Sequence, residues 1–212
     1  MTDTSAPEQR RTLGILGGTF NPPHLGHLAI ARHAREQLGI ERVLLMPAGA
    51  PPHKPIEHDP GTAQRLQMCG LLVEGAEGLA VSALETERQG PSYTVDTVRT
   101  LHASHPETEL TFIVGADVAS TLPSWREPQA LLELARCAVA ARPGSDRDGL
   151  LDALAPLGGR VRFLDAPLLD ISSSRARAQA AAGEPIERLV GHAVASYISE
   201  HGLYRAHAAA MR

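Results

Sequence analysis

A glycine- and proline-rich segment at residues 17–27, with the sequence GGTFNPPHLGH, is the feature that most constrains how this chain can fold. It follows a short apolar run at residues 13–16 and precedes residues 28–38, where apolar residues recur four apart, as on one helix face. The pattern predicts a buried strand, a tight turn and a helix. In the turn, Gly17 and Gly18 lack the Cβ atoms that would hold a ligand away from the backbone.

Two histidines stand at the start of the expected helix. His24 lies just before the helix and His27 in its first turn, so both imidazoles can face one point. A helix N-terminus offers unpaired N–H groups and a partial positive charge, which suits a phosphate. Three interpretations are open: a structural turn with surface histidines, a zinc site, and a nucleotide-phosphate site. A catalytic zinc site needs a third ligand, and no Cys or acidic residue lies near in sequence.

Strand-like and helix-like patterns alternate along the rest of the chain. Strands are expected at residues 42–46, 79–84, 109–114, 136–141 and 160–164, and helices at 62–74, 93–102, 130–134, 173–182 and 189–204. This alternation predicts an α/β fold, a doubly wound parallel sheet with helices on both faces. Ligands of such sheets bind beyond the carboxyl ends of the strands, which is where the histidine turn lies. We expect one domain at residues 12–205, with a disordered tail at 1–11 and a C-terminal tail at 206–212.

The composition argues against several classes of protein. A net charge of -4, from 20 Lys and Arg against 24 Asp and Glu, disfavours a broad nucleic-acid surface. Apolar runs fall short of the roughly 18 residues that a membrane span needs, and residues 1–11 lack a signal-peptide core. Cys69 and Cys137 fall in an expected helix and strand, where buried small residues are the simplest role. We therefore expect a cytoplasmic protein with neither a nucleic-acid nor a membrane partner.

Several candidate side chains follow the expected strands. Lys54 lies in a proline-rich loop. Its ammonium group can lie over the phosphate tail of a ligand, or Lys54 can remain a solvated surface lysine. Ser92 or Thr94 can cap the helix that begins near residue 93. Asp117 follows the fourth strand, where it can accept from sugar hydroxyls or cap a short helix, and Arg142 closes the fifth strand.

Two later stretches also suggest ligand contacts. Trp125, the only tryptophan, lies in a loop between two prolines, where it either folds back on the core or stacks on a planar ring. Residues 169–177 read LDISSSRAR, so three serines open a helix. Serine hydroxyls and free N–H groups make an anion site, and Arg177, one turn in, faces the same end. Capping explains one serine, but not three followed by two arginines.

These motifs resemble a known family. Residues 17–27 are similar to the (H/T)xGH signature of the nucleotidyltransferase superfamily. The turn at residues 88–94, RQGPSYT, and the Ser-Trp pair at 124–125 narrow the resemblance to the bacterial nicotinate-nucleotide adenylyltransferases. The resemblance runs from about residue 13 to residue 204 and implies a Rossmann-like nucleotidyltransferase fold.

The resemblance also implies an activity, namely transfer of the adenylyl group of ATP to nicotinate mononucleotide, giving nicotinate adenine dinucleotide and pyrophosphate for NAD biosynthesis. It implies that Mg²⁺ is bound mainly through the ATP phosphates, without a protein metal site. The implied catalytic residues are His24, His27, Lys54 and Arg177. The implied ATP contacts are these four together with Gly17, Gly18, Thr19, Phe20, Asp117, Ser173 and Ser174, and Arg142 is a further candidate ATP contact from its place after the fifth strand. The implied contacts to the nicotinate nucleotide are Thr94, Trp125 and Arg126.

The chain departs from the family pattern in three places. Asn21 stands where Asp is commoner, and we expect little change because either side-chain oxygen can fix a tight turn. Ser174 replaces Thr and keeps the hydroxyl, whereas Ala176 replaces a branched residue and loses packing. Other acceptors, such as nicotinamide mononucleotide or phosphopantetheine, remain open, as does a non-catalytic nucleotide sensor. Whether the chain forms a homo-oligomer is also left open.

Overall fold

The structure is a computed structural model that describes residues 11–52, 56–141, 144–158, 160–165 and 169–205. Lys54 and Arg142 lie outside the described residues, as do the expected tails apart from Arg11. Within the described part of the chain, no helix is both long and apolar enough to cross a bilayer.

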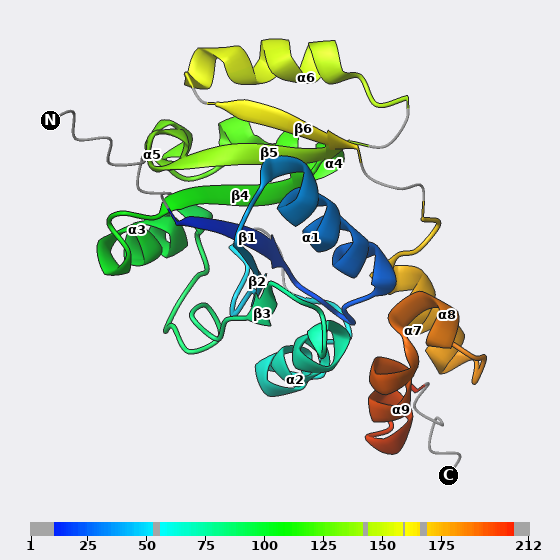
Figure 1. Cartoon of the computed structure of the whole chain (residues 1–212). Coiled ribbons are helices and arrows are strands. Elements are labelled where there is room, and N and C mark those ends of the chain that lie inside the picture. Colours follow the sequence, from blue (N-terminus) through cyan, green and yellow to red (C-terminus); the bar gives the residue numbers. More distant parts are fainter. Residues whose placement is uncertain (1–10, 53–55, 142–143, 159, 166–168, 206–212) are drawn as a thin grey trace, which may run out of the picture.

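Six parallel strands form a single sheet in the order β3-β2-β1-β4-β5-β6 (Figure 1). The strands are β1 (Thr12–Gly18), β2 (Arg42–Pro47), β3 (Leu79–Val81), β4 (Glu109–Gly115), β5 (Ala135–Ala141) and β6 (Val161–Asp165). The six expected strands are confirmed, and so is the doubly wound sheet. The third strand is shorter than predicted because the chain turns at Ala83, whose carbonyl accepts hydrogen bonds from the side chain of Thr86 and the backbone of Glu87.

Helices and short 3-10 turns connect the strands. They are α1 (Leu25–Leu38), α2 (Thr62–Val73), α3 (Thr94–Ser104), α4 (Ala116–Ala119), η1 (Leu122–Ser124), α5 (Pro128–Leu134), α6 (Arg147–Leu154), η2 (Ala155–Leu157), α7 (Ser173–Ala181), α8 (Glu187–Val190) and α9 (His192–Glu200). The expected helix at 189–204 is two helices, because Gly191 between them has a φ of 84°, outside the helical region. Gly202, with a φ of 61°, ends the second.

Each face of the sheet has its own hydrophobic core. Successive strand residues point to opposite faces, so Ile15 joins the core under α3, α5 and α6 whereas Leu16 joins the core under α1, α2 and the C-terminal helices. Ala176 is completely buried in the second of these cores, so α7 docks despite its small side chain. Cys69 and Cys137 are buried and free, as predicted.

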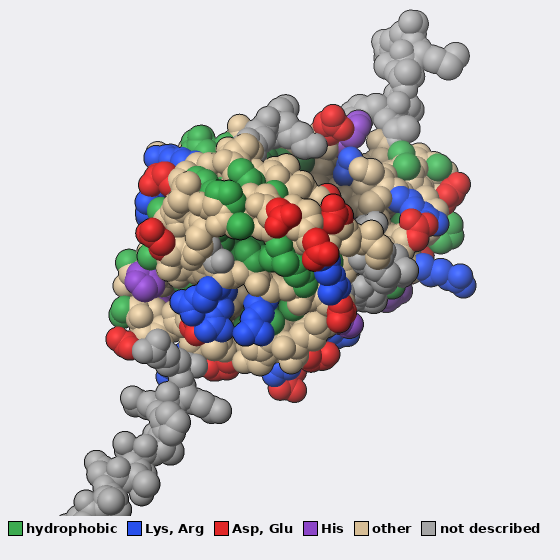
Figure 2. Space-filling model, turned by 90° about the horizontal axis from the view of Figure 1, so that it is seen from above, with side chains coloured by type: hydrophobic (Ala, Val, Ile, Leu, Met, Phe, Trp, Pro, Cys, Tyr) green, Lys and Arg blue, Asp and Glu red, His purple; other side chains and the backbone are tan. Residues whose placement is uncertain are grey.

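The fold brings the histidine turn to the edge where ligands of such sheets bind. Strand β1 pairs with β2 on one side and β4 on the other, so the strand order reverses at the carboxyl ends of β1 and β4. The histidine turn follows β1 at this point. Helices α7 and α8 lie beside the start of α1 (Figure 1). On the face seen in Figure 2, basic and acidic side chains both occur and no continuous basic stripe crosses it.

Candidate active site

His24 and His27 hold each other at the start of α1. His24 is the N-cap, and its Nδ1 accepts from the backbone N–H of His27 at 3.3 Å. The Nδ1 of His27 accepts in return from the backbone N–H of His24 at 3.2 Å. The rings are stacked, with centroids 3.6 Å apart and planes 21° apart, and Phe20 meets the His27 ring edge-on at 4.8 Å. The two imidazoles therefore share one fixed orientation.

This packing also affects the protonation of the two histidines. Burial lowers the pKa of His24 to about 4, and it lowers the pKa of His27 well below its usual range, helped by the charge of His24. Both rings are therefore neutral at pH 7. Because each Nδ1 accepts a hydrogen bond, each ring carries its proton on Nε2. Among the described residues neither Nε2–H has a hydrogen-bond partner, which leaves two donors for a ligand.

The turn before His24 is anchored from three distant segments. Asn21 is 2% exposed, and its Nδ2 donates to the carbonyl of Glu57 at 2.7 Å. Its Oδ1 accepts from the hydroxyl of Tyr204, also at 2.7 Å, and its carbonyl accepts from Arg177. The expectation that Asp could stand here with little change considered only the side-chain oxygen. The amide N–H that holds the Glu57 carbonyl has no counterpart in Asp.

Beneath the turn lies Arg65 of α2, the largest fully buried side chain in the described residues. Its Nε donates to Asp59 at 2.9 Å, and its Nη1 donates to the carbonyls of Thr19 and Ala48 at 2.9 and 2.8 Å. One guanidinium thus joins the histidine turn, the end of β2 and the segment that leads into α2. Pattern analysis did not single out Arg65, because a charged residue in an amphipathic helix is expected to face solvent.

The serine-rich start of α7 packs against the same turn. Ser172 is the N-cap and accepts from the N–H of Arg175, so one serine does cap the helix. Ser173 donates to the carbonyl of Pro22 at 2.9 Å. Arg177 donates to the carbonyl of Asn21 at 2.7 Å and lies 3.4 Å from the hydroxyl of Ser174. The fold thus brings Arg177 and both candidate serines beside the histidine turn, although they are about 150 residues away in sequence.

The remaining ATP candidates flank the ends of β1 and β4. Gly17 is exposed at the end of β1, and a Cβ built there meets nothing within 4 Å, so its backbone faces open space. Gly18 borders the ring of Phe20, which is buried and can offer a ligand only its backbone. Thr19 is exposed next to it. Asp117 is exposed in α4 after β4, and it does not cap that helix, whose N-cap is Gly115.

A small pocket of about 80 Å³ gathers the three candidates for the nicotinate nucleotide. Thr94, Trp125 and Arg126 line it, and its volume is well below the roughly 300 Å³ of a pocket for a whole drug-sized ligand. Trp125 is half-buried against the core, and its indole N–H donates to Thr121 at 2.9 Å. The guanidinium of Arg126 lies 4.8 Å over the ring of Tyr93. The arrangement has the size and polarity to take one planar, anionic ring.

The prediction that Ser92 or Thr94 caps α3 is wrong. The N-cap is Tyr93, and no side chain of the described residues caps the helix. Thr94 is the first helical residue, so its N–H and that of Val95 belong to the donors that an uncapped helix leaves free. Ser92 instead accepts from the backbone N–H groups of Gly49 and Ala50 across the pocket.

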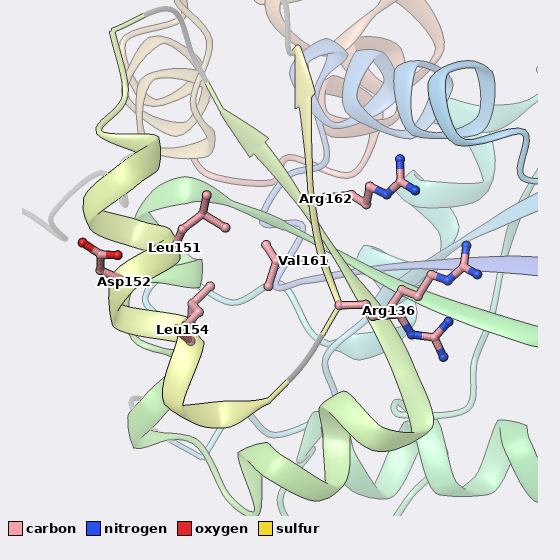
Figure 3. A pocket seen from close by; sticks show the side chains of 8 residues that line it. Arg136, Leu151, Asp152, Leu154, Val161 and Arg162 are labelled. Carbon is pink, nitrogen blue, oxygen red and sulfur yellow. The ribbon is translucent and has the colours of Figure 1, made fainter.

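No group of three or more His, Cys, Asp or Glu side chains within the described residues is arranged to hold a metal ion. A larger cavity of about 610 Å³ lies elsewhere, at the amino ends of β5 and β6 (Figure 3). There Arg136 and Arg162 extend away from Leu151 and Leu154 of α6, so their guanidinium groups do not converge within the cavity (Figure 3). The catalytic candidates lie at the opposite edge of the sheet.

Known proteins match this chain over most of its length. Residues 15–179 match the cytidylyltransferase-like family. A probable nicotinate-nucleotide adenylyltransferase of Synechococcus sp. is 44% identical over 200 residues, covering 93% of this chain and 96% of that protein. One from Gloeobacter violaceus is 42% identical, covering 91% and 95%. The nicotinic acid mononucleotide adenylyltransferase of Plasmodium falciparum complexed with NaAD shares the fold, with a TM-score of 0.75 at 18% identity over 92% of this chain and 97% of that chain.

Proposed function

This chain belongs to the nicotinate-nucleotide adenylyltransferase family among the cytidylyltransferase-like proteins, and from that premise we propose that it transfers the adenylyl group of ATP to nicotinate mononucleotide. The observation that carries the proposal is the pair of neutral imidazoles at the start of α1, whose Nε2–H groups have no partner within the part of the chain that the structure describes. They stand at the carboxyl edge of the sheet, beside Arg177 and on the same edge as the ring-sized pocket.

The reaction needs positioned donors more than a base. A phosphate oxygen of nicotinate mononucleotide attacks the α-phosphorus of ATP, the bond to the bridging oxygen of the β-phosphate breaks, and pyrophosphate leaves. The attacking phosphate is already an anion, so no proton has to be removed. The Nε2–H groups of His24 and His27 donate to the α-phosphate oxygens as charge develops there. Because burial fixes both rings, the site needs little reorganisation at the moment of reaction.

The β- and γ-phosphates are held by positive charge and by hydroxyl groups from other candidate residues. Arg177, Ser173 and Ser174 stand at the start of α7 against the histidine turn, which supports a role at the phosphate tail. We assign Lys54 to the same ATP site from its motif alone, and Arg142 from its place after β5 in the sequence. Gly17, Gly18, Thr19 and the backbone of Phe20 border the nucleotide, and Asp117 accepts from the ribose hydroxyls.

A divalent cation, Mg²⁺, is the cofactor of this proposal. We place this ion chiefly on phosphate oxygens and water, the ligands that Mg²⁺ usually takes in nucleotide sites. When bound, it adds positive charge to the leaving pyrophosphate. The protein residues named above hold the phosphates to which the ion is bound.

The acceptor pocket supports nicotinate over other acceptors. Trp125 offers an aromatic face to the pyridine ring, and stacking of this kind contributes about 1–3 kcal/mol. The nicotinate carboxylate accepts hydrogen bonds from the uncapped N–H groups at the start of α3 and from the hydroxyl of Thr94. Arg126 adds a nearby positive charge. Nicotinamide mononucleotide keeps the stacking on Trp125 but lacks the carboxylate, so it gains less from the start of α3 and from Arg126.

Pyrophosphate release from ATP and Mg²⁺ tests the proposal, with nicotinate mononucleotide, nicotinamide mononucleotide and phosphopantetheine offered in parallel. We expect the fastest release with nicotinate mononucleotide, and loss of that release in His24→Ala. Equal rates with both pyridine nucleotides would remove the carboxylate contact from the proposal. ATP binding without release for any acceptor would identify a nucleotide sensor instead of an enzyme.

A further inference from the structure

Polar side chains interrupt the sheet face that α1 covers, at the amino ends of the strands. Thr111 of β4 lies directly beside Arg136 of β5 in the register of the sheet. Arg162 of β6 lies beside Ala138, two residues further along β5. Side chains on one face recur every second residue, so all three polar residues share the face of Ala138, which belongs to the core under α1. The apolar core of this face therefore gives way to polar groups at the amino edge.

A cavity of about 210 Å³, which we call the amino-edge pocket, lies at this place. Its lining includes Thr111, Arg136 and Arg162, together with Gln37 and Leu38 in the last turn of α1. The volume is below the roughly 300 Å³ of a pocket for a drug-sized ligand, so it suits a small molecule or ion. The pocket borders the end of α1, whereas the histidine turn stands at the start of that helix. Any ligand here is therefore separate from the phosphates of the proposed reaction.

The hydroxyl of Thr111 has no hydrogen-bond partner among the described residues, although Thr111 is only 6% exposed and lines the amino-edge pocket. Polar groups with so little exposure are normally paired, because burial removes the hydrogen bonds that water would supply. Thr12, the other threonine of the pocket, is paired, since its Oγ1 donates to the carbonyl of Gly39 and accepts from the N–H of Glu41. Thr111 therefore needs a partner that enters the pocket.

Two guanidinium groups border the same pocket. Arg136 and Arg162 both extend away from α6, toward the same side of their strands (Figure 3). Nη1 of Arg136 pairs with Glu109, the one acidic residue of the lining, whereas Arg162 is exposed and has no ion pair within the described part of the chain. The lining thus has an excess of positive charge. The partial negative charge at the end of α1 favours arginines nearby, but no carbonyl of the described residues accepts from the Thr111 hydroxyl.

We propose that the amino-edge pocket binds a small phosphate anion, either inorganic phosphate or pyrophosphate. Its oxygens accept hydrogen bonds from the guanidinium groups of Arg136 and Arg162 and from the hydroxyl of Thr111. Guanidinium groups match phosphate oxygens well, because their N–H donors are planar and always carry positive charge. A phosphate group presents oxygens in several directions, so it can accept from two arginines and a hydroxyl together. The anion also balances the excess positive charge of the lining.

Backbone amide NMR of the full chain tests the site by titration with inorganic phosphate and, separately, with inorganic pyrophosphate, with chloride holding the ionic strength constant. We expect saturable shifts of the amide signals of Thr111, Arg136 and Arg162. The anion that saturates these shifts at the lower concentration is the preferred ligand. The amides of His27 and Ser174 report phosphate binding at the catalytic edge separately. If neither anion shifts the three amino-edge signals, the pocket holds only water and the inference is wrong.

Two variants remove single contacts of the proposed anion. Thr111→Val removes the hydroxyl, and Arg162→Gln removes an exposed charge. We expect each to raise the Kd read from the Arg136 amide about tenfold, with the shifts of His27 and the release of pyrophosphate unchanged.

Arg32→Gln is the matched control, because Arg32 is exposed on α1, does not line the pocket and has no ion pair within the described residues. Equal weakening in Arg32→Gln and Arg162→Gln would reduce the effect to overall charge and overturn the site. An unchanged Kd in both pocket variants would also overturn it. If Thr111→Val fails to fold, Arg162→Gln decides the question, since its side chain is exposed. The NMR signals need no turnover, so the outcome is separate from that of the proposed activity.

Discussion

The backbone N–H of His27 donates to Nδ1 of His24, and the backbone N–H of His24 donates to Nδ1 of His27. The same two side chains therefore close the first turn of α1 and fix the tautomer in which Nε2 carries the proton. Helix capping and phosphate binding are often alternatives for a residue at an N-terminus. Here each imidazole can serve in both ways, because Nδ1 accepts the capping hydrogen bond while Nε2–H can donate to a phosphate.

The burial of His24 predicts a loss of stability in acid. In the unfolded chain this imidazole takes up a proton near pH 6.5, whereas in the folded protein it does so only near pH 4. Its contribution is complete above pH 6.5 and is lost as the pH falls from 6.5 to 4, which amounts to about 2 kcal/mol at pH 5. Urea unfolding at pH 7.5 and pH 5 measures this. His24→Asn, a good cap that does not titrate, should show a smaller fall. An equal loss of stability in the wild type and in His24→Asn would show that His24 is not the source of the acid sensitivity.

Arg65 is expected to be the most sensitive charged position outside the catalytic set. Arg65→Lys keeps the charge but cannot reach Asp59, Thr19 and Ala48 together, so buried partners lose their donors. We expect a loss of about 3–5 kcal/mol in the free energy of unfolding, measured by urea titration. Arg32→Lys, at an exposed position on α1, is the control and should change stability by less than about 0.5 kcal/mol. Similar effects of the two changes would show that the three hydrogen bonds of Arg65 do not make it a special position.

Asn21→Asp tests whether the amide of this residue matters. The change removes the donor to the Glu57 carbonyl and places a charge at a site that is 2% exposed. We expect a loss of about 1–3 kcal/mol at pH 7, and a smaller loss near pH 4, where the new carboxyl is protonated. Tyr204→Phe removes only the hydroxyl bond to Oδ1 and should cost about 1 kcal/mol. Unchanged thermal unfolding of Asn21→Asp would show that the oxygen alone suffices.

Gly49→Ala and Gly70→Ala form a pair with opposite expected outcomes. At Gly49 a methyl group collides with the carbonyl of Glu85, so we expect lower stability by about 1–3 kcal/mol and a raised KM for nicotinate mononucleotide. At Gly70, on the exposed side of α2, a methyl group meets nothing within 4 Å. There the better helix propensity of Ala should add up to about 1 kcal/mol. Thermal unfolding and acceptor kinetics check both, and a harmless Gly49→Ala would contradict the close packing of this loop on the backbone of Glu85.

The elements of the fold were predictable because their signals are local. The apolar runs that became β1, β2, β4 and β5 are buried on both faces, which gives a continuous hydrophobic signal within a few residues. The strand–turn–helix at residues 17–27 was predictable for the same reason. The third strand is an exception, because the turn at Ala83 ends it earlier than its apolar pattern predicted.

The amino-acid sequence by itself determined the alternation of strands and helices, the sheet edge that carries the histidines, and the family resemblance that named an acceptor. Only the tertiary structure decided how these parts hold one another. The hydroxyl of Tyr204 reaches Asn21 across 183 residues, and Ser92 joins two loops instead of capping a helix. Local patterns report which face of an element is apolar. The partner of a buried polar group depends instead on how the elements pack, and so does the burial that keeps His24 and His27 neutral.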